Sequence, residues 1–202
     1  METTSDNRTP REILSQFYTE NNFDADGGSK STSVKIQLTP KFHFYYPNYP
    51  ARRKAVLRHD VHHLLTQYST ALAGETEISA WEIASGCKKY WAAFLLDTSG
   101  VMLGFPFNFF RILKAFARGR RTKNLYDEAF SIDKALDTPV AELRKQLLLD
   151  KHPQNTKPTF VDFILLMCFA VFGFIYSLAL LIFLPLIIVY SVYEELKASK
   201  RK

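Results

Sequence analysis

Three of the chain's five histidines lie within five residues, beside an aspartate. The stretch "RHDVHHLLTQYSTALAGE" holds His59, Asp60, His62 and His63, and Glu75 follows twelve residues after His63. On a helix, His59 and His63 share a face because they are four residues apart, a spacing that presents two imidazoles to one metal ion. Asp60 lies at the edge of that face, whereas His62 points to the other side.

Glu75 can reach such a site only if the chain reverses before it. In a continuous helix, twelve residues would carry Glu75 about 18 Å from His63. Ser69, Thr70 and Gly74 all suit a helix end or turn, so we expect a reversal there, with Glu75 opening the next helix. Two imidazoles and two carboxylates form a ligand set for Zn, Fe, Mn or Co rather than Ca. The alternative is a salt-bridged surface or a satisfied core histidine without a metal.

The elements that position these residues are predicted to be helical. Apolar residues recur at helical spacing in 51–68 and 75–97, and Thr138 with Pro139 forms a helix start. The segment "VKIQL" alternates like a short strand or extended lead-in, and "KFHFYYPNYP" should be extended because it is rich in proline. Strand signals are scarce after these segments. The fold class is therefore all-α.

Composition divides the chain into five parts. We expect a flexible polar arm at 1–33, a helical domain at 34–150, a linker at 151–162, a transmembrane or membrane-embedded helical segment at 163–193 and a basic tail at 194–202. The arm contains one short helical pattern, "PREILSQFY".

The segment 163–193 contains no charged residue and no histidine over 31 residues. A membrane span needs roughly 20 apolar residues. Each flank carries four lysines and arginines, so the positive-inside rule does not orient the segment, and both a single span and a re-entrant hairpin remain open. The polar N-terminus has neither a secretory nor a transit pattern. We expect a bacterial inner membrane location with the helical domain in the cytoplasm.

A basic amphipathic pattern occurs in "FNFFRILKAFARGRR". Arg111, Lys114 and Arg118 recur along one side, and Phe110 and Phe116 belong to another. This pattern is typical of a helix that faces anionic lipid, and a core-facing helix with a solvated basic side is the alternative. The formal net charge of +6 fits an anionic partner, but no nucleic-acid motif is present, so nucleic acid is not expected.

The histidine stretch resembles the signature His-Asp-x-x-His-x(11)-Glu of the Coq-four family of ubiquinone-biosynthesis proteins. The similarity continues through "LLTQYSTALAGE", where Gln67 replaces the usual glycine, and through "AWEIASG", "GRRTKNLYD" and "TPVAELRKQL". It covers Tyr49 to Leu148, so the polar arm and the apolar segment lie outside it.

This resemblance implies an α-helical, lipid-handling protein on a membrane. It implies a divalent metal held by His59, Asp60, His63 and Glu75, and an apolar cleft for isoprenoid tails. The implied activity removes the ring C1 carboxylate of a polyprenylated benzoate, with hydroxylation there. The implied partners are a polyprenylated quinone precursor or another isoprenoid lipid, the membrane and other quinone-biosynthesis enzymes.

Two other functions compete with this one. The protein could be a non-enzymatic, isoprenoid-binding scaffold whose metal only orders two helices. It could also be an HD-type phosphohydrolase, with His43 and Asp97 as further ligands. A set of aromatic residues either lines a channel for a lipid tail or forms ordinary core: Trp81, Phe94, Phe105 and Phe107. Four further residues near the motif are assigned to helix surfaces: Glu82, Cys87, Lys88 and Lys89. No disulfide between Cys87 and Cys168 is expected.

Overall fold

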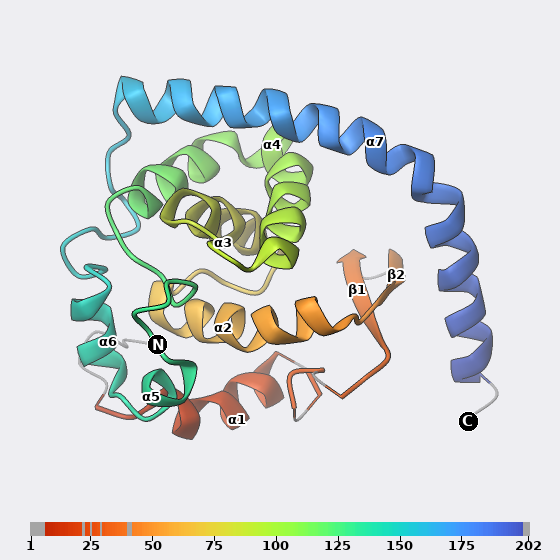
Figure 1. The fold of residues 1–202 in the computed structure, drawn as a ribbon, viewed down its shortest axis with the longest axis horizontal. Coiled ribbons are helices and arrows are strands. Elements are labelled where there is room, and N and C mark those ends of the chain that lie inside the picture. The colour runs from red at the N-terminus through yellow and green to blue at the C-terminus, as the bar shows by residue number, and fades with distance from the viewer. Residues whose placement is uncertain (1–6, 22, 25, 29, 40–41, 200–202) are drawn as a thin grey trace.

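The computed structural model describes residues 7–21, 23–24, 26–28, 30–39 and 42–199. Helices dominate this part of the chain, as the sequence predicts, and a two-stranded hairpin precedes the main helices (Figure 1). The elements are α1 (Pro10–Glu20), β1 (Ser33–Thr39), β2 (Phe42–Pro47), α2 (Pro50–Thr66), α3 (Leu72–Ser85), α4 (Trp91–Gly119), α5 (Ile132–Leu136), α6 (Val140–Gln146) and α7 (Phe160–Ser199).

The helices α3 and α4 pack closely at the centre of the fold. A Cβ atom added at Gly104 would lie 2.5 Å from the side chain of Thr76, so only glycine permits this approach. Asn108 interrupts α4 with a non-helical φ of −127° two residues after Pro106. Its side-chain amide donates to the carbonyl of Ala73 (2.9 Å) and to the Thr76 hydroxyl (2.7 Å), which fixes the kink against α3.

The N-terminal helix α1 is part of the core. Thr9 and Glu12 form a capping box that starts the helix, and the side chains of Ile13, Leu14 and Tyr18 are buried. The prediction of a flexible arm is therefore wrong for residues 10–20. It fails because the amphipathic face of a short helix finds cover only in the tertiary structure. Residues 1–6 lie outside the described residues.

The strands β1 and β2 pair antiparallel, with Val34 opposite Tyr46 and Lys35 opposite Tyr45. This confirms the strand expected in "VKIQL" and the extended backbone expected after it, apart from residues 40 and 41, which are not among the described residues.

The helix α7 is the longest element, and it passes over α4 and then turns down beside the hairpin (Figure 1). It contains Pro185 and continues through residues 194–199, so the described part of the basic tail is helical, while residues 200–202 are outside the described residues. A re-entrant hairpin requires the chain to reverse within the apolar segment. The structure contradicts that alternative, because α7 is one unbroken helix. Both α4 and α7 are long and apolar enough to cross a membrane. Within the most apolar 18 residues of each helix, 33% is buried in α4 and 6% in α7.

Candidate metal centre

The predicted reversal between the two motif helices is present. α2 ends at Thr66, and Gln67 takes a left-handed conformation with φ 64°. α3 then begins at Leu72 and carries Glu75 in its first turn. Gly74 packs directly on the backbone of Ser69, where a larger residue would collide. The turn therefore brings Glu75 back toward the histidines of α2, as the sequence predicts.

Three of the four predicted ligands meet at one point. The Nε2 atoms of His59 and His63 lie 3.2 Å apart. Glu75 faces both, with Oε2 at 3.4 Å from His59 Nε2 and Oε1 at 3.3 Å from His63 Nε2. In a tetrahedral zinc site with bonds of about 2.0–2.1 Å, neighbouring ligand atoms are about 3.3 Å apart. The spacing of these three side chains therefore fits one metal ion.

The Nδ1 atom of each ring makes a hydrogen bond away from this point, and this bond determines that Nε2 faces it. His63 Nδ1 lies 3.0 Å from the carbonyl oxygen of Tyr68, which can only accept, so Nδ1 carries the proton. His59 Nδ1 lies 3.1 Å from Oε1 of Glu82 and donates to that carboxylate. In the neutral rings, both Nε2 lone pairs then point at each other and at the Glu75 carboxylate. Such a set of acceptors attracts a cation, and the outer hydrogen bonds are those that metal-ligating histidines make.

The two glutamates favour positive charge at the centre, here as a proton on His59. Burial disfavours the imidazolium of His59, but Glu82 and Glu75 outweigh it and hold the pKa of His59 well above 6.5. Burial likewise opposes ionisation of Glu75, but the two histidines outweigh it and lower its pKa to about 2. Glu75 is 36% exposed, so one side of the centre opens to solvent. Structural zinc sites are closed, whereas catalytic sites keep an open position.

The fourth predicted ligand, Asp60, faces another way. Its Oδ2 accepts a hydrogen bond from the hydroxyl of Tyr18 on α1 (3.0 Å). Gly27, with φ 62°, passes so close that an added Cβ atom would lie 2.9 Å from the same oxygen. Burial raises the pKa of Asp60. In this arrangement Asp60 anchors the N-terminal segment to α2 and is not grouped with the other three ligands.

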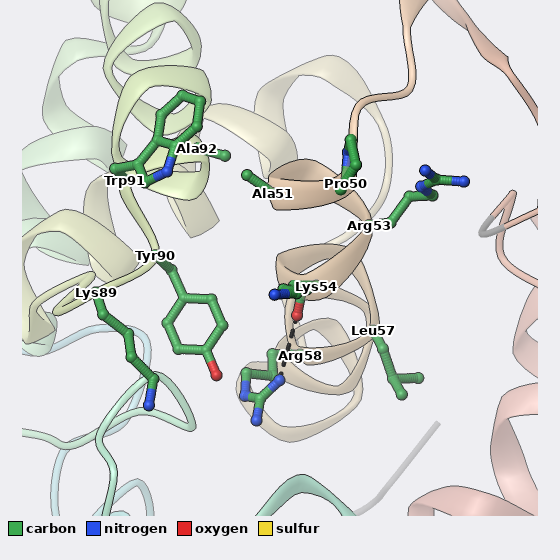
Figure 2. A pocket seen from close by; sticks show the side chains of 10 residues that line it. All are labelled: Pro50, Ala51, Arg53, Lys54, Leu57, Arg58, Lys89, Tyr90, Trp91 and Ala92. Carbon is green, nitrogen blue, oxygen red and sulfur yellow. Dashed lines mark hydrogen bonds between the residues drawn. The ribbon is translucent and has the colours of Figure 1, made fainter.

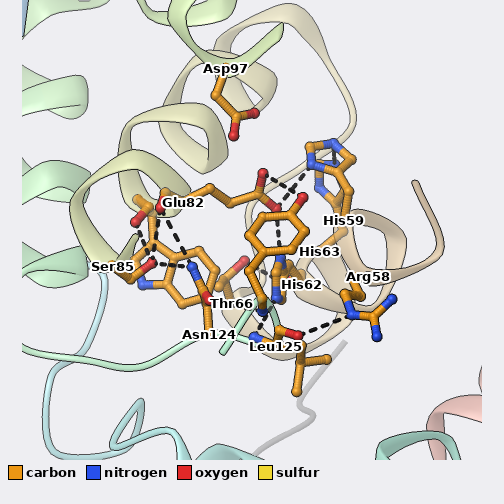
Figure 3. A network of polar contacts seen from close by, with 12 residues as sticks. Arg58, His59, His62, His63, Thr66, Glu82, Ser85, Asp97, Asn124 and Leu125 are labelled. Carbon is orange, nitrogen blue, oxygen red and sulfur yellow. Dashed lines mark hydrogen bonds and ion pairs between the residues drawn. The ribbon is translucent and has the colours of Figure 1, made fainter. Parts of the chain in front are cut away.

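The buried carboxylate of Glu82 accepts hydrogen bonds from two histidines of α2, one of which is the predicted ligand His59 (Figure 3). Its Oε1 accepts from the Nδ1 atoms of His59 and His62, at 3.1 and 2.5 Å, and its Oε2 accepts from the hydroxyl of Tyr126 at 3.2 Å. Burial opposes ionisation of Glu82, but His59 and His62 outweigh it and hold the pKa of Glu82 well below its usual value. The other ring nitrogen of His62, Nε2, accepts a hydrogen bond from the backbone N–H of Leu125 (2.9 Å). As predicted, His62 lies off the metal-facing side.

The helix-surface assignment is wrong for Glu82 and Cys87, since both are buried. Lys88 and Lys89 are exposed, but they lie in the turn between α3 and α4 and not on a helix. A spacing signal existed for Glu82: it lies seven residues, or two turns, after Glu75, so both face α2. Cys87 is held by the tertiary fold, with Sγ 3.5 Å from Asp97 Oδ2. Both cysteines are free, as expected.

A second group of residues that could hold a metal ion shares His59. Its members are His59, Glu82 and Asp97, whose ligand atoms lie within 4.8 Å of one another. His59 presents Nδ1 to Glu82 and Nε2 to Glu75, so the two groups use opposite sides of one ring. Asp97 thus lies near the centre, as the phosphohydrolase interpretation requires. His43 does not: it is on β2 and pairs with Glu195 (3.0 Å).

The candidate lipid-facing residues separate into two sets. Phe110 is 76% exposed, Lys114 is exposed, and Arg111 is exposed while its guanidinium pairs with Glu77 (2.6 Å). Phe116 and Arg118 are buried, so the prediction that they face lipid is wrong.

Arg118 is buried because its guanidinium connects α4 to the end of α2 and to the segment that precedes α7. It donates to the carbonyl oxygens of His152 (2.8 Å) and Thr66 (2.9 Å), and its guanidinium lies over the ring of Tyr68. Phe116 joins the main core cluster. Trp81 is also core: it is fully buried, and its Nε1 donates to Thr122 (2.8 Å).

A half-open cavity of about 720 Å³ lies between α2 and the start of α4, and none of the three grouped ligands lines it (Figure 2). Its lining combines cations with aromatic rings: Pro50, Ala51, Arg53, Lys54, Leu57, Arg58, Lys89, Tyr90, Trp91 and Ala92. Arg58 lies over the ring of Tyr90 at 4.7 Å, and Lys89 pairs with Glu128. Trp91 is largely exposed and stacks on Tyr49.

No family model matches the chain, and neither a curated protein nor a solved structure matches it.

Proposed function

We propose that the protein is a membrane-associated, metal-dependent protein of prenylquinone biosynthesis. The observation that carries the proposal is the convergence of His59 Nε2, His63 Nε2 and the Glu75 carboxylate at mutual distances of 3.2 to 3.4 Å. Two histidines and one carboxylate hold zinc in hydrolytic sites and non-haem iron in oxygenases. The resemblance of the motif to the Coq-four family supplies the substrate class.

In this proposal the metal is held by His59, His63 and Glu75. A metal bound there supplies a Lewis acid for the carboxylate and phenolic oxygens of an aromatic substrate. The reaction breaks the bond between ring C1 and its carboxylate, releases CO₂ and forms a C–O bond at C1. If dioxygen supplies the oxygen, its second atom leaves as water and a two-electron donor is required.

The chain's own residues have separate roles. Glu82 fixes the ring of His59, and the Tyr68 carbonyl fixes that of His63, so both present Nε2 to the centre. The exposed side of Glu75 leaves room for substrate. Asp60 becomes a fourth ligand only if its carboxylate leaves Tyr18. Two long apolar helices, α4 and α7, keep the centre beside a membrane, where polyprenyl substrates reside.

A scaffold without catalysis is the second candidate. It is favoured by the buried network of Glu82, His62 and Tyr126, which joins α2, α3 and the segment after α4 as a structural element would. Under this interpretation the metal centre orders helices and the protein holds an isoprenoid lipid for partner enzymes. The phosphohydrolase is not supported, because His43 pairs with α7 instead of facing the centre.

Metal analysis separates these proposals. Protein purified in detergent is measured by mass spectrometry for metal content and by circular dichroism for folding. We expect about one metal per chain in the wild type, and its loss in folded His63→Ala and Glu75→Gln variants. His43→Ala is the matched control and keeps the metal. Absence of metal from the wild type after reconstitution would refute the metal-dependent proposal.

Turnover distinguishes enzyme from scaffold. A prenylated 4-hydroxybenzoate is incubated with the metal-loaded protein, dioxygen and a reductant, and CO₂ release is followed. The enzyme proposal predicts release that His63→Ala abolishes while the fold survives. Metal bound without CO₂ release, together with unfolding of His63→Ala, would instead support the scaffold.

A further inference from the structure

Both ends of α7 are attached to the same domain. At its start, Asp162 pairs with Arg120 (2.6 Å) and Arg121 (2.7 Å), which directly follow α4. Near its end, three contacts join α7 to the hairpin. The hydroxyl of Ser33 donates to Glu194 (3.0 Å), His43 pairs with Glu195 (3.0 Å), and the backbone N–H of Tyr45 donates to Ser191 (3.0 Å). We call these three contacts the hairpin clasp.

The hairpin clasp is incompatible with a conventional span. Residues 163–193 are about 46 Å long as a helix, longer than the roughly 30 Å hydrocarbon core. If they crossed the bilayer, residues 191–195 would leave on the side opposite to Asp162. The hairpin would then have to follow them, although β2 is separated from the first residue of α2 by only Asn48 and Tyr49.

The outward side of α7 is nevertheless apolar from residue 163 to residue 193. Its inner stripe packs on the domain through Leu166, Ala170 and Gly173, and Gly173 touches Met102 of α4. Between this stripe and the clasp, every residue from 181 to 186 is exposed, in the sequence Leu-Ile-Phe-Leu-Pro-Leu. A helix that is apolar on all sides is stable only when it is surrounded by apolar material.

Lipid fits this surface better than a second protein copy. A copy packed on one stripe would leave the other sides of residues 181–186 in water, whereas acyl chains reach every side. The equal number of cations on the two flanks, which gives no preference for opposite sides, agrees with two ends in one headgroup layer.

We infer that α7 enters one leaflet of the membrane without crossing it, so that both of its ends lie on the same side, and that the hairpin clasp holds it there. The domain takes the place of the polar face that an interfacial helix normally carries. This inference rests on the proposed membrane association and goes beyond it by assigning both ends of α7 to the same side.

Site-directed labelling tests the arrangement in membranes of one orientation, isolated from expressing cells. Cys168 is replaced by serine, Cys87 is buried, and a single cysteine is introduced by Asn155→Cys or Ser199→Cys, both at exposed positions before and at the end of α7. An impermeant maleimide is added before and after the membrane is opened. The one-sided arrangement of α7 predicts labelling of both variants from the same side. Labelling from opposite sides overturns it.

Cross-linking tests the hairpin clasp in the same membranes. The pair Ser33→Cys with Glu194→Cys should be joined by a short bis-maleimide, whereas the control pair Asn155→Cys with Glu194→Cys should not. Loss of the Ser33 cross-link on membrane binding overturns the inference. Flotation with vesicles of anionic phospholipid separates the two proposals. A chain that does not float refutes membrane association itself, and one that floats but labels on opposite sides refutes only the one-sided placement of α7.

Discussion

The Nδ1 atom of His59 lies 3.1 Å from Oε1 of Glu82, on the side of the ring opposite to the Nε2 atom that faces Glu75. One buried carboxylate thereby sets both the tautomer and the direction of a predicted metal ligand. The strength of the metal site should depend on a residue that does not touch the metal.

Replacing Glu82 with glutamine removes the negative charge but keeps the shape. We expect the metal affinity to fall by about 10–100-fold, because His59 loses its oriented, charge-assisted hydrogen bond. A chelator competition titration measures this. Glu77→Gln is the matched control on the same helix, because Glu77 pairs with Arg111 instead. Equal affinities for both variants and the wild type would show that Glu82 has no part in the site.

The exposed ring of Phe110 should contribute to membrane binding. Phe110→Ser is expected to weaken partitioning into anionic vesicles by about tenfold, since burying a phenylalanine contributes about 1.5–3 kcal/mol. Its thermal unfolding midpoint should not change. Phe116→Ser should behave in the opposite way, with a lower unfolding midpoint, because Phe116 is in the core. Unchanged partitioning of Phe110→Ser would place the membrane surface elsewhere.

The start of α7 should become less stable in acid. Burial opposes ionisation of Asp162, but Arg121, Thr159 and Arg120 outweigh it and lower its pKa to about 2 from 3.8. A carboxyl group with a lowered folded-state pKa stabilises the fold above its unfolded pKa. About 2 kcal/mol is therefore lost as pH falls from about 4 to 2. Asp162→Asn should lose this part of the pH dependence in denaturant titrations. An identical pH profile would contradict the pairing.

Gln67 is held in a left-handed conformation that favours glycine, with φ 64°. Gln67→Gly should raise the free energy of unfolding by about 0.5–1 kcal/mol, because relief of strain exceeds the added entropy of the unfolded chain. Gln16→Gly, within the exposed side of α1, is the control and should lower it by about 1 kcal/mol. Chemical denaturation measures both. A loss of stability in Gln67→Gly would mean that other contacts of the glutamine outweigh the strain.

The sequence predicted the part of the site that depends on local spacing. His59 and His63 share a helix face because of the helical repeat, and Gly74 marks the turn that returns Glu75. The orientation of Asp60 could not be read in this way. It depends on Tyr18, a residue forty-two positions away in a segment that looks like a polar arm.

The remaining differences come from packing between distant segments. The burial of Arg118 depends on carbonyl groups at Thr66 and His152, which no periodicity reveals. A basic amphipathic helix looks the same in sequence whether its cations meet lipid or a neighbouring loop. The apolar length of α7 was evident from composition, but its path along the domain depends on Asp162 at one end and Ser191 at the other.

The hairpin clasp also constrains the order of events during synthesis. Ser33 meets Glu194 across 161 positions of sequence, so this contact forms only after residue 194 has left the ribosome. The first strand must wait for the last helix, while the apolar residues 181–186 emerge before their attachment point. The domain therefore cannot complete its fold until residues 191–195 have emerged, and the apolar surface of α7 lacks this attachment in the interval.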